Sequence, residues 1–139
     1  MGNNQESQLY VKMKECTLRE KLNFRTNIHH FPSNNTHVSQ IKGLISSLNV
    51  DSTVHGILVQ LPLPDHLRDE QSNLLKMIDL HKDVDGLRYP HSPFIPCAAQ
   101  GILWLLTWYN VNLSGKNVVV VGASKLVGNK NNEEIFLHE

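Results

Sequence analysis

Apolar residues recur at helical spacing along much of the chain. The spacing predicts four helices, at residues 8–22, 37–48, 65–80 and 98–109. Ser7 and Asp65 stand where the caps of the first and third helices are expected. The residues expected to face a core from the first helix are Leu9, Met13, Cys16 and Leu18. Those expected to do so from the second are Val38, Ile41, Ile45 and Leu48.

Two short apolar runs lie outside these helices and predict β-strands. Residues 54–61 contain several branched side chains and end at a Pro-Leu-Pro corner, and residues 118–121 are four valines in a row. Short apolar runs of this kind are typical of strands that are buried in a parallel sheet. Because strands and helices alternate along the chain, the sequence predicts an α/β fold with a parallel sheet.

The composition argues against several classes of protein. The chain of 139 residues is 40% hydrophobic and 19% charged, and its 13 basic residues balance its 13 acidic ones. This balance gives no reason to expect binding to nucleic acid or to an anionic membrane. No apolar run reaches the roughly 18–20 residues that span a bilayer, and the N-terminal stretch does not have the pattern of a signal peptide. Two distant cysteines fit a reducing compartment, so we expect a cytoplasmic protein, with a mitochondrial location as the alternative.

Tyr10, Lys14 and Gln60 are the candidate catalytic residues. Tyr10 and Lys14 are four positions apart, so their side chains meet on one face of a helix. A partly desolvated lysine can act as a general acid or base near neutrality. Gln60 lies near the carboxyl end of a predicted parallel strand, where open α/β sheets bind ligands, and its amide could hold both an ammonium group and a substrate. The alternatives are an ordinary surface Tyr–Lys pair and an amide bonded to a loop backbone.

Two further motifs could bind a ligand. Asp83 and Asp85, in the stretch KDVDG, could bind a cationic or amide-rich edge, although an Asp-Gly pair is also typical of a turn. Gly122, Ser124 and Gly128 follow the four valines and resemble a phosphate-binding loop, without the standard G-x-G-x-x-G spacing. The eight histidines show no metal-ligand spacing, so we expect no metal site.

Taken in order, four stretches resemble one family, the methylenetetrahydrofolate dehydrogenase/cyclohydrolases. They are SQLYVKMK, VHGILVQLPLP, KDVDGL, and FIPC followed by GKNVVVVGASKLVG. The likeness runs from Met1 to about Gly128. It implies a multifunctional oxidoreductase and hydrolase of one-carbon metabolism, with a link to purine biosynthesis. Such an enzyme oxidises 5,10-methylenetetrahydrofolate with NADP or NAD, and then hydrolyses the 5,10-methenyl product to 10-formyltetrahydrofolate.

The resemblance implies a role for each matching residue. Lys14 would be the catalytic lysine of both steps, with its charge tuned by Gln60. Tyr10 would stack on the folate rings, and Asp85 would receive the aminopyrimidine edge of the pterin. The other residues expected to line the tetrahydrofolate substrate are Val11, Lys12, Met13, Val59 and Leu61. Those expected in the cofactor loop are Gly122, Ser124, Val127 and Gly128.

The resemblance also implies a domain organisation. It places a three-layer parallel-sheet substrate domain at residues 1–97, a connecting helix and turn at 98–115, and the first strand of a Rossmann-like cofactor domain at 116–139. The first strand of the family and most of its cofactor domain have no counterpart here, and Ala123 stands where the family has an arginine that holds a cofactor phosphate. We therefore expect a truncated member of a family that forms homodimers. The alternative is an inactive fragment, or a non-catalytic folate-binding or subunit-pairing remnant.

Overall fold

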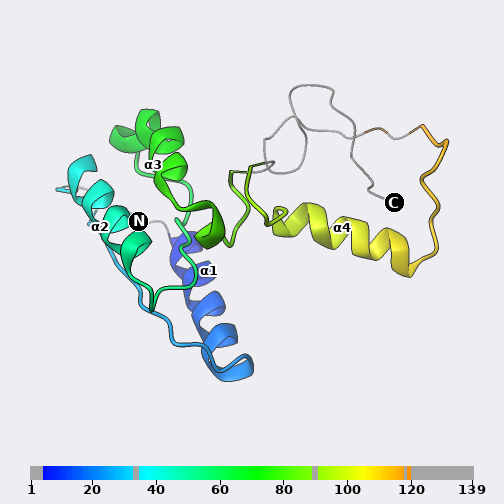
Figure 1. Cartoon of the computed structure of the whole chain (residues 1–139), viewed down its shortest axis with the longest axis horizontal. Coiled ribbons are helices and arrows are strands. Elements are labelled where there is room, and N and C mark those ends of the chain that lie inside the picture. Colours follow the sequence, from blue (N-terminus) through cyan, green and yellow to red (C-terminus); the bar gives the residue numbers. More distant parts are fainter. Residues whose placement is uncertain (1–4, 33–34, 89–90, 118, 120–139) are drawn as a thin grey trace. The chain divides into compact units, whose positions relative to one another are not determined.

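The chain divides into two compact units, Met1–Lys82 and Asp83–Glu139 (Figure 1). The computed structural model describes residues 5–32, 35–88, 91–117 and 119. Within these residues the first unit contains helices α1 to α3 and the main hydrophobic core, and the second contains helix α4 and the loop before it. The domain boundaries expected from the sequence, after residues 97 and 115, differ from this division and stay a prediction.

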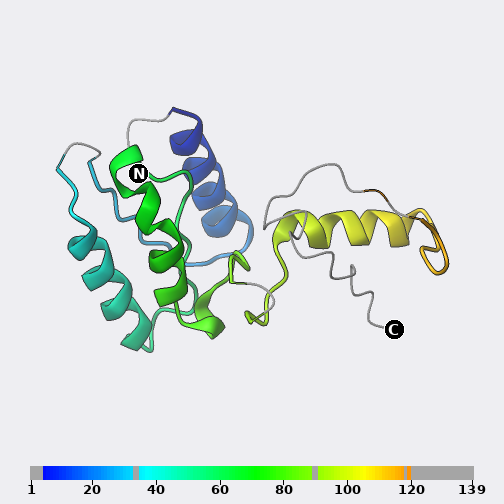
Figure 2. The same ribbon diagram turned by 90° about the horizontal axis from the view of Figure 1, so that it is seen from above.

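Helices α1 (Gln5–Cys16), α2 (Val38–Val50) and α3 (Gln71–Met77) belong to the first unit, and α2 packs against α3 (Figure 2). The helix predicted at residues 37–48 is confirmed by α2, and so is its predicted inward face. Its inward residues Ile41 and Ile45 are buried, and Val38 and Leu48 pack against them as partly buried neighbours. The Gln40 side chain accepts a hydrogen bond from His37 N–H at 2.9 Å, which satisfies one free donor at the start of this helix.

The prediction for the inward face of the first helix was largely wrong. Ser7, expected as a cap, lies inside α1 and is only 5% exposed. Leu9 and Met13 are 59% and 57% exposed, although both were expected to face a core. The less exposed positions are 7, 11, 14, 15 and 18, which lie on one face at helical spacing. Because α1 is polar on average, its few apolar side chains do not decide which face turns inward.

The first helix also ends earlier than expected. After Cys16 the chain continues as a π-helical turn over Thr17–Lys21. Cys16 is exposed rather than part of a core, and its thiol donates a hydrogen bond to Glu20 at 3.0 Å across this turn. That hydrogen bond to the Glu20 carboxylate raises the pKa of the Cys16 thiol. Cys16 is therefore a poor nucleophile at neutral pH.

The segment at residues 54–61, expected to be a strand, is extended but forms no β-ladder with another described part of the chain. Ile57 and Val59 are buried and Leu61 is half-buried, at alternating positions, as on one face of a strand. The Ile57 N–H donates to the Lys82 carbonyl at 2.7 Å, but a strand pair needs such bonds to repeat along both partners. The other expected strand, at residues 118–121, lies outside the described residues except for Val119.

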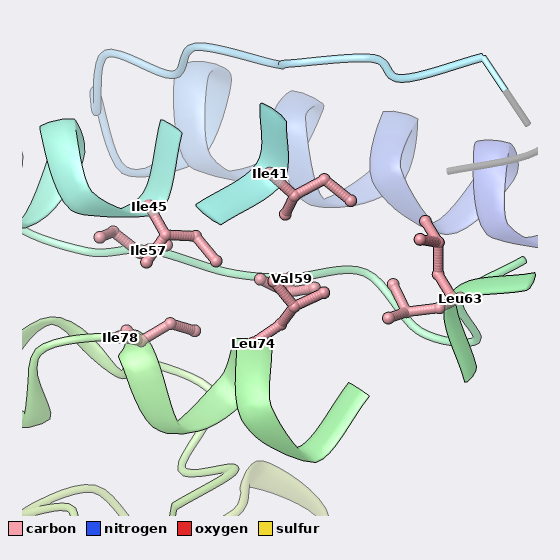
Figure 3. Close-up of a cluster of buried hydrophobic side chains, with 8 residues drawn as sticks. Ile41, Ile45, Ile57, Val59, Leu63, Leu74 and Ile78 are labelled. Carbon is pink, nitrogen blue, oxygen red and sulfur yellow. The ribbon is translucent and has the colours of Figure 1, made fainter. Parts of the chain in front are cut away.

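The hydrophobic core of the first unit lies between α2, the extended segment and α3 (Figure 3). Its buried members are Ile41, Ile45, Ile57, Val59, Leu63, Leu67, Leu74 and Ile78. Full burial of a side chain of this size contributes about 1.5–3 kcal/mol relative to exposure. This cluster therefore fixes the extended segment, which carries Gln60, against α2 and α3.

The third predicted helix is divided into two elements. Residues Asp65–Glu70 form a 3-10 helix before α3, and Pro64 rather than Asp65 occupies the cap position. The Asp65 carboxylate accepts a hydrogen bond from Arg68 instead of from a backbone N–H. Glu70 forms an ion pair with Lys42 of α2 at 2.9 Å, and this ammonium holds the pKa of Glu70 below its ordinary value.

Lys82, the last residue of a short 3-10 helix over Leu80–Lys82, closes the carboxyl end of α2. Its Nζ donates to the carbonyl oxygens of Leu48 at 2.9 Å, Asn49 at 2.8 Å and Asp51 at 2.8 Å. The last carbonyls of a helix have no partner within the helix, and a cation there also interacts favourably with the helix dipole. Lys82 therefore ties the end of α2 to the start of the KDVDG motif, of which it is the first residue.

Replacing Lys82 with Met should destabilise the first unit by about 1–3 kcal/mol, because partly buried carbonyls lose a charged donor. Urea denaturation followed by far-UV circular dichroism measures this loss. Lys76→Met is the matched control, because Lys76 is an exposed lysine on α3. Equal unfolding midpoints for the two variants would contradict the capping role of Lys82.

Helix α4 (Cys97–Trp108) is the helix of the second unit and agrees with the helix predicted at residues 98–109. None of its residues is buried, and Trp104, Leu105 and Trp108 are all strongly exposed. Among the described residues, no helix has the length and apolar content needed to cross a membrane.

Candidate functional site

Lys14 and Gln60 are in contact although they are 46 positions apart. Lys14 lies in the last turn of α1, and its Nζ donates to Gln60 Oε1 at 3.5 Å, a long hydrogen bond. Both side chains are half-buried. Tyr10, one turn earlier on α1, is 58% exposed. The structure thus brings Lys14 and Gln60 together and leaves the Tyr10 ring accessible.

The Gln60 amide is oriented by a second hydrogen bond. Its Nε2 donates to the Leu61 carbonyl at 2.7 Å, in the turn that follows the extended segment. The amide oxygen, which is the acceptor of the side chain, is left for Lys14. The Gln60 nitrogen thus bonds a loop backbone, as one of the sequence interpretations expected, while its oxygen accepts a hydrogen bond from Lys14 Nζ.

The other residues expected to line the substrate lie in different environments. Val11 and Leu61 are half-buried, whereas Lys12 and Met13 are exposed on α1. Val59 is buried, and its side chain points into the hydrophobic core (Figure 3). Only the backbone of Val59 is thus left to face a ligand.

The last four residues of the KDVDG motif, Asp83–Gly86, form a tight turn in the second unit. The Gly86 N–H donates to the Asp83 carbonyl at 3.0 Å, and Gly86 has a φ of 65°. A Cβ at Gly86 would lie 2.7 Å from the Phe94 oxygen and 2.7 Å from the Pro96 nitrogen, so glycine is required here for both conformation and space. The interpretation of the Asp85–Gly86 pair as part of a turn is therefore confirmed, and the turn begins at Asp83, whose side chain is fully buried.

Asp85, the other acidic residue of the motif, has a different environment. It is half-buried and lines a small, open pocket of the second unit. The residues that line this pocket are Asp85, Leu87, Pro96, Cys97 and Ala98. The surface of this pocket is almost entirely apolar, so it offers contact area to an apolar group or a flat ring.

The sequence interpretation missed the roles of three residues near these groups. Lys82 was not recognised as an anchor, because the carbonyls that it caps lie 31 to 34 positions earlier in the chain. Asp83 was considered as a ligand-binding group and not as an anchor of its own turn. Cys97 lines the pocket and begins α4, where nothing in the sequence distinguished it from a structural cysteine. Within the described residues, no group of His, Cys, Asp and Glu could hold a metal ion. The cofactor-loop residues Gly122, Ser124, Val127 and Gly128 lie outside the described residues.

The chain resembles solved structures of methylenetetrahydrofolate dehydrogenases. A bifunctional methylenetetrahydrofolate dehydrogenase/cyclohydrolase from Campylobacter jejuni matches with a TM-score of 0.79 and 39% identity, over 91% of this chain and 47% of that one. The Trypanosoma brucei dehydrogenase-cyclohydrolase, solved in complex with NADP and an inhibitor, matches with a TM-score of 0.79 and 31% identity, over 91% and 45%. The likeness defines the class of the chain as an α/β dehydrogenase fold.

The family follows from the sequence comparisons. The tetrahydrofolate dehydrogenase/cyclohydrolase catalytic domain matches residues 1–85, and the NAD(P)-binding domain of the same enzymes matches residues 96–137. The chain belongs to the tetrahydrofolate dehydrogenase/cyclohydrolase family. A bifunctional FolD protein of Thermodesulfovibrio yellowstonii is 43% identical over 136 residues, which are 92% of this chain and 46% of that protein. The chain thus spans about half the length of the curated relatives it matches.

Proposed function

We propose that this protein acts on tetrahydrofolate derivatives in one-carbon metabolism. As a methylenetetrahydrofolate dehydrogenase/cyclohydrolase, it would oxidise the 5,10-methylene compound with NADP or NAD and hydrolyse the 5,10-methenyl compound to 10-formyltetrahydrofolate. The contact between Lys14 and Gln60 is the observation that supports this proposal most strongly. This contact brings together the two residues for which the family resemblance implies a catalytic role in the proton transfers.

Lys14 would carry the proton transfers of the hydrolysis. Water attacks the bridging carbon of the methenyl cation, and a neutral Nζ accepts a proton from the attacking water. The bond from this carbon to N5 then breaks, N5 takes up a proton, and the formyl group stays on N10. The reaction consumes one water and releases one proton. A neutral amine suits this substrate, because a second positive charge nearby would repel the cation.

Gln60 would control the position of the lysine during these steps. Its oxygen accepts a hydrogen bond from Nζ, and its nitrogen is tied to the Leu61 carbonyl. The lysine is thus held by a neutral partner, which orients Nζ without adding a negative charge. A carboxylate at this position would favour the ammonium form and hinder proton uptake from water.

Asp85 would recognise the pterin. The amino group and the ring N–H of an aminopyrimidine can both donate to one carboxylate, which gives a paired and directional contact. The apolar residues beside Asp85, including Leu87 and Pro96, offer surface to a flat ring. Tyr10, with its exposed ring, is proposed to stack on the same class of ligand.

Two finer features of the family are also proposed for this protein. Residues 54–61 would be a strand of a parallel sheet in the complete fold, in agreement with the alternating burial of Ile57 and Val59. Homodimerisation is the second feature, and analytical ultracentrifugation measures it.

The dinucleotide would be held by the loop at Gly122–Gly128, whose residues belong to the part matched by the NAD(P)-binding domain.

Hydrolysis of 5,10-methenyltetrahydrofolate tests the proposed function. The methenyl compound loses its characteristic absorbance when it opens, so the decay can be followed with the purified chain and in buffer alone. We expect the chain to accelerate the decay, and Gln60→Ala to reduce this acceleration by about tenfold, because Nζ loses its hydrogen-bond partner. A folded chain that leaves the decay at the buffer rate would contradict the catalytic proposal.

A further inference from the structure

We propose that Asp83 is a positioning residue, which holds the backbone turn that presents Asp85 to the pterin. The inference rests on the proposed function of Asp85 and adds to it a residue that contacts no substrate. Asp83 is fully buried, with 0% of its surface exposed. Burying a carboxylate costs free energy unless hydrogen bonds stabilise it. The hydrogen-bond partners of Asp83 therefore indicate its structural role.

The Asp83 carboxylate is held by two backbone N–H groups of the same turn. Its Oδ1 accepts from Leu87 N–H at 3.2 Å, and its Oδ2 accepts from Arg88 N–H at 2.9 Å. Hydrogen bonds to a charged acceptor are roughly twice as strong as those between neutral groups. Asp83 therefore fixes both residues that immediately follow Gly86.

The backbone of Asp83 anchors a second segment. The Ser92 hydroxyl donates to the Asp83 carbonyl at 3.4 Å, and the Phe94 N–H donates to the Ser92 oxygen at 3.2 Å. Ser92 is itself only 5% exposed. The close approach of Gly86 to the backbone of residues 94–96 locks the two segments together. The buried Asp83 is thus the common anchor of residues 86–88 and 92–94.

The residues that line the pocket lie in these two segments or close to them in the sequence. Asp85 lies between Asp83 and Gly86 in the turn, and Leu87 follows directly. Pro96 and Cys97, which also line the pocket, follow the segment held by Ser92 after one intervening residue. Asp83 therefore limits the movement of Asp85 relative to the apolar residues of the pocket. This fixed spacing is what a paired contact to a pterin edge requires.

A double-mutant cycle tests whether Asp83 acts through Asp85. The probe is 5-formyltetrahydrofolate, which has the pterin edge and no bridging carbon to hydrolyse, titrated into the full chain by calorimetry. We expect Asp83→Asn to weaken binding by about tenfold, the equivalent of one charge-assisted hydrogen bond. In an Asp85→Asn background the same change should weaken binding by less than about twofold, because the residue it positions is already lost. If Asp83→Asn weakened binding by the same factor in the wild-type and Asp85→Asn chains, the proposal would be overturned.

Hydrogen exchange gives a readout that does not depend on the ligand. The amides of Leu87 and Arg88 should exchange at least about tenfold faster in Asp83→Asn than in wild type, and at the wild-type rate in Asp85→Asn. Leu74→Ala, which weakens the core of the first unit, controls for general destabilisation. If the wild-type chain does not bind the probe, the proposed function is contradicted, and the positioning role of Asp83 is then judged from hydrogen exchange alone. Unchanged exchange rates at the Leu87 and Arg88 amides in Asp83→Asn would overturn this positioning role.

Discussion

Replacing Lys14 with Met is expected to lower the rate of 5,10-methenyltetrahydrofolate hydrolysis by about 10²–10⁴-fold, the usual contribution of a general acid or base. Met keeps most of the apolar stem of the side chain and removes only the group that takes up the proton. Binding of 5-formyltetrahydrofolate should therefore change little. The measurement is the enzyme-dependent decay of the methenyl absorbance, with a binding titration beside it.

Lys21→Met is the matched control for this prediction. Lys21 ends the π-helical turn that continues α1, is exposed, and is not among the residues expected to contact the substrate. We expect the Lys21 variant to hydrolyse the methenyl compound at the wild-type rate. Comparable hydrolysis by the Lys14 variant and wild type would show that the proton transfers do not depend on Lys14.

The second large effect is expected in the core. Leu74→Ala should reduce the free energy of unfolding by about 2–5 kcal/mol, because it removes buried methyl groups and leaves a cavity. Leu74 is fully buried among Val59, Ile78 and their neighbours. Small domains have total stabilities of only about 5–15 kcal/mol, so the loss is a large fraction of the whole. Urea denaturation followed by far-UV circular dichroism measures it.

Leu58→Ala provides the comparison for the core variant. Leu58 is 39% exposed, next to the buried Ile57 and Val59 on the extended segment. Its truncation should change the free energy of unfolding by less than about 1 kcal/mol. If both variants unfolded at the same urea concentration, the alternating burial of this segment would be wrong.

The sequence predicted those parts of the fold in which burial follows a simple period. In α2, the apolar positions recur every three or four residues, and the buried side chains are the expected ones. Helix α4 also matches its prediction closely. The first helix was different, because its apolar residues are few and its inward face includes Ser7 and Lys14. Periodicity cannot identify a face that is fixed by polar contacts.

The candidate site was predictable to a different extent for each residue. A motif resemblance was needed to pair Lys14 with Gln60, since local spacing cannot relate residues 46 positions apart. The sequence could not show which of Asp83 and Asp85 is buried, because both are aspartates of the same short motif. Asp83 is the buried one, and two backbone N–H groups donate hydrogen bonds to its carboxylate. The same limit applies to Lys82, whose three carbonyl partners come together only in the folded chain.

Equilibrium binding of 5-formyltetrahydrofolate is the most direct test of the central claim, that this chain carries a folate site. Calorimetric titration of the folded wild-type chain should show saturable binding to one site, and Asp85→Asn should weaken it by at least about tenfold, because a charged hydrogen-bonding partner is lost. Far-UV circular dichroism of the same samples establishes that both proteins are folded. A folded wild-type chain that shows no saturable binding would contradict the account.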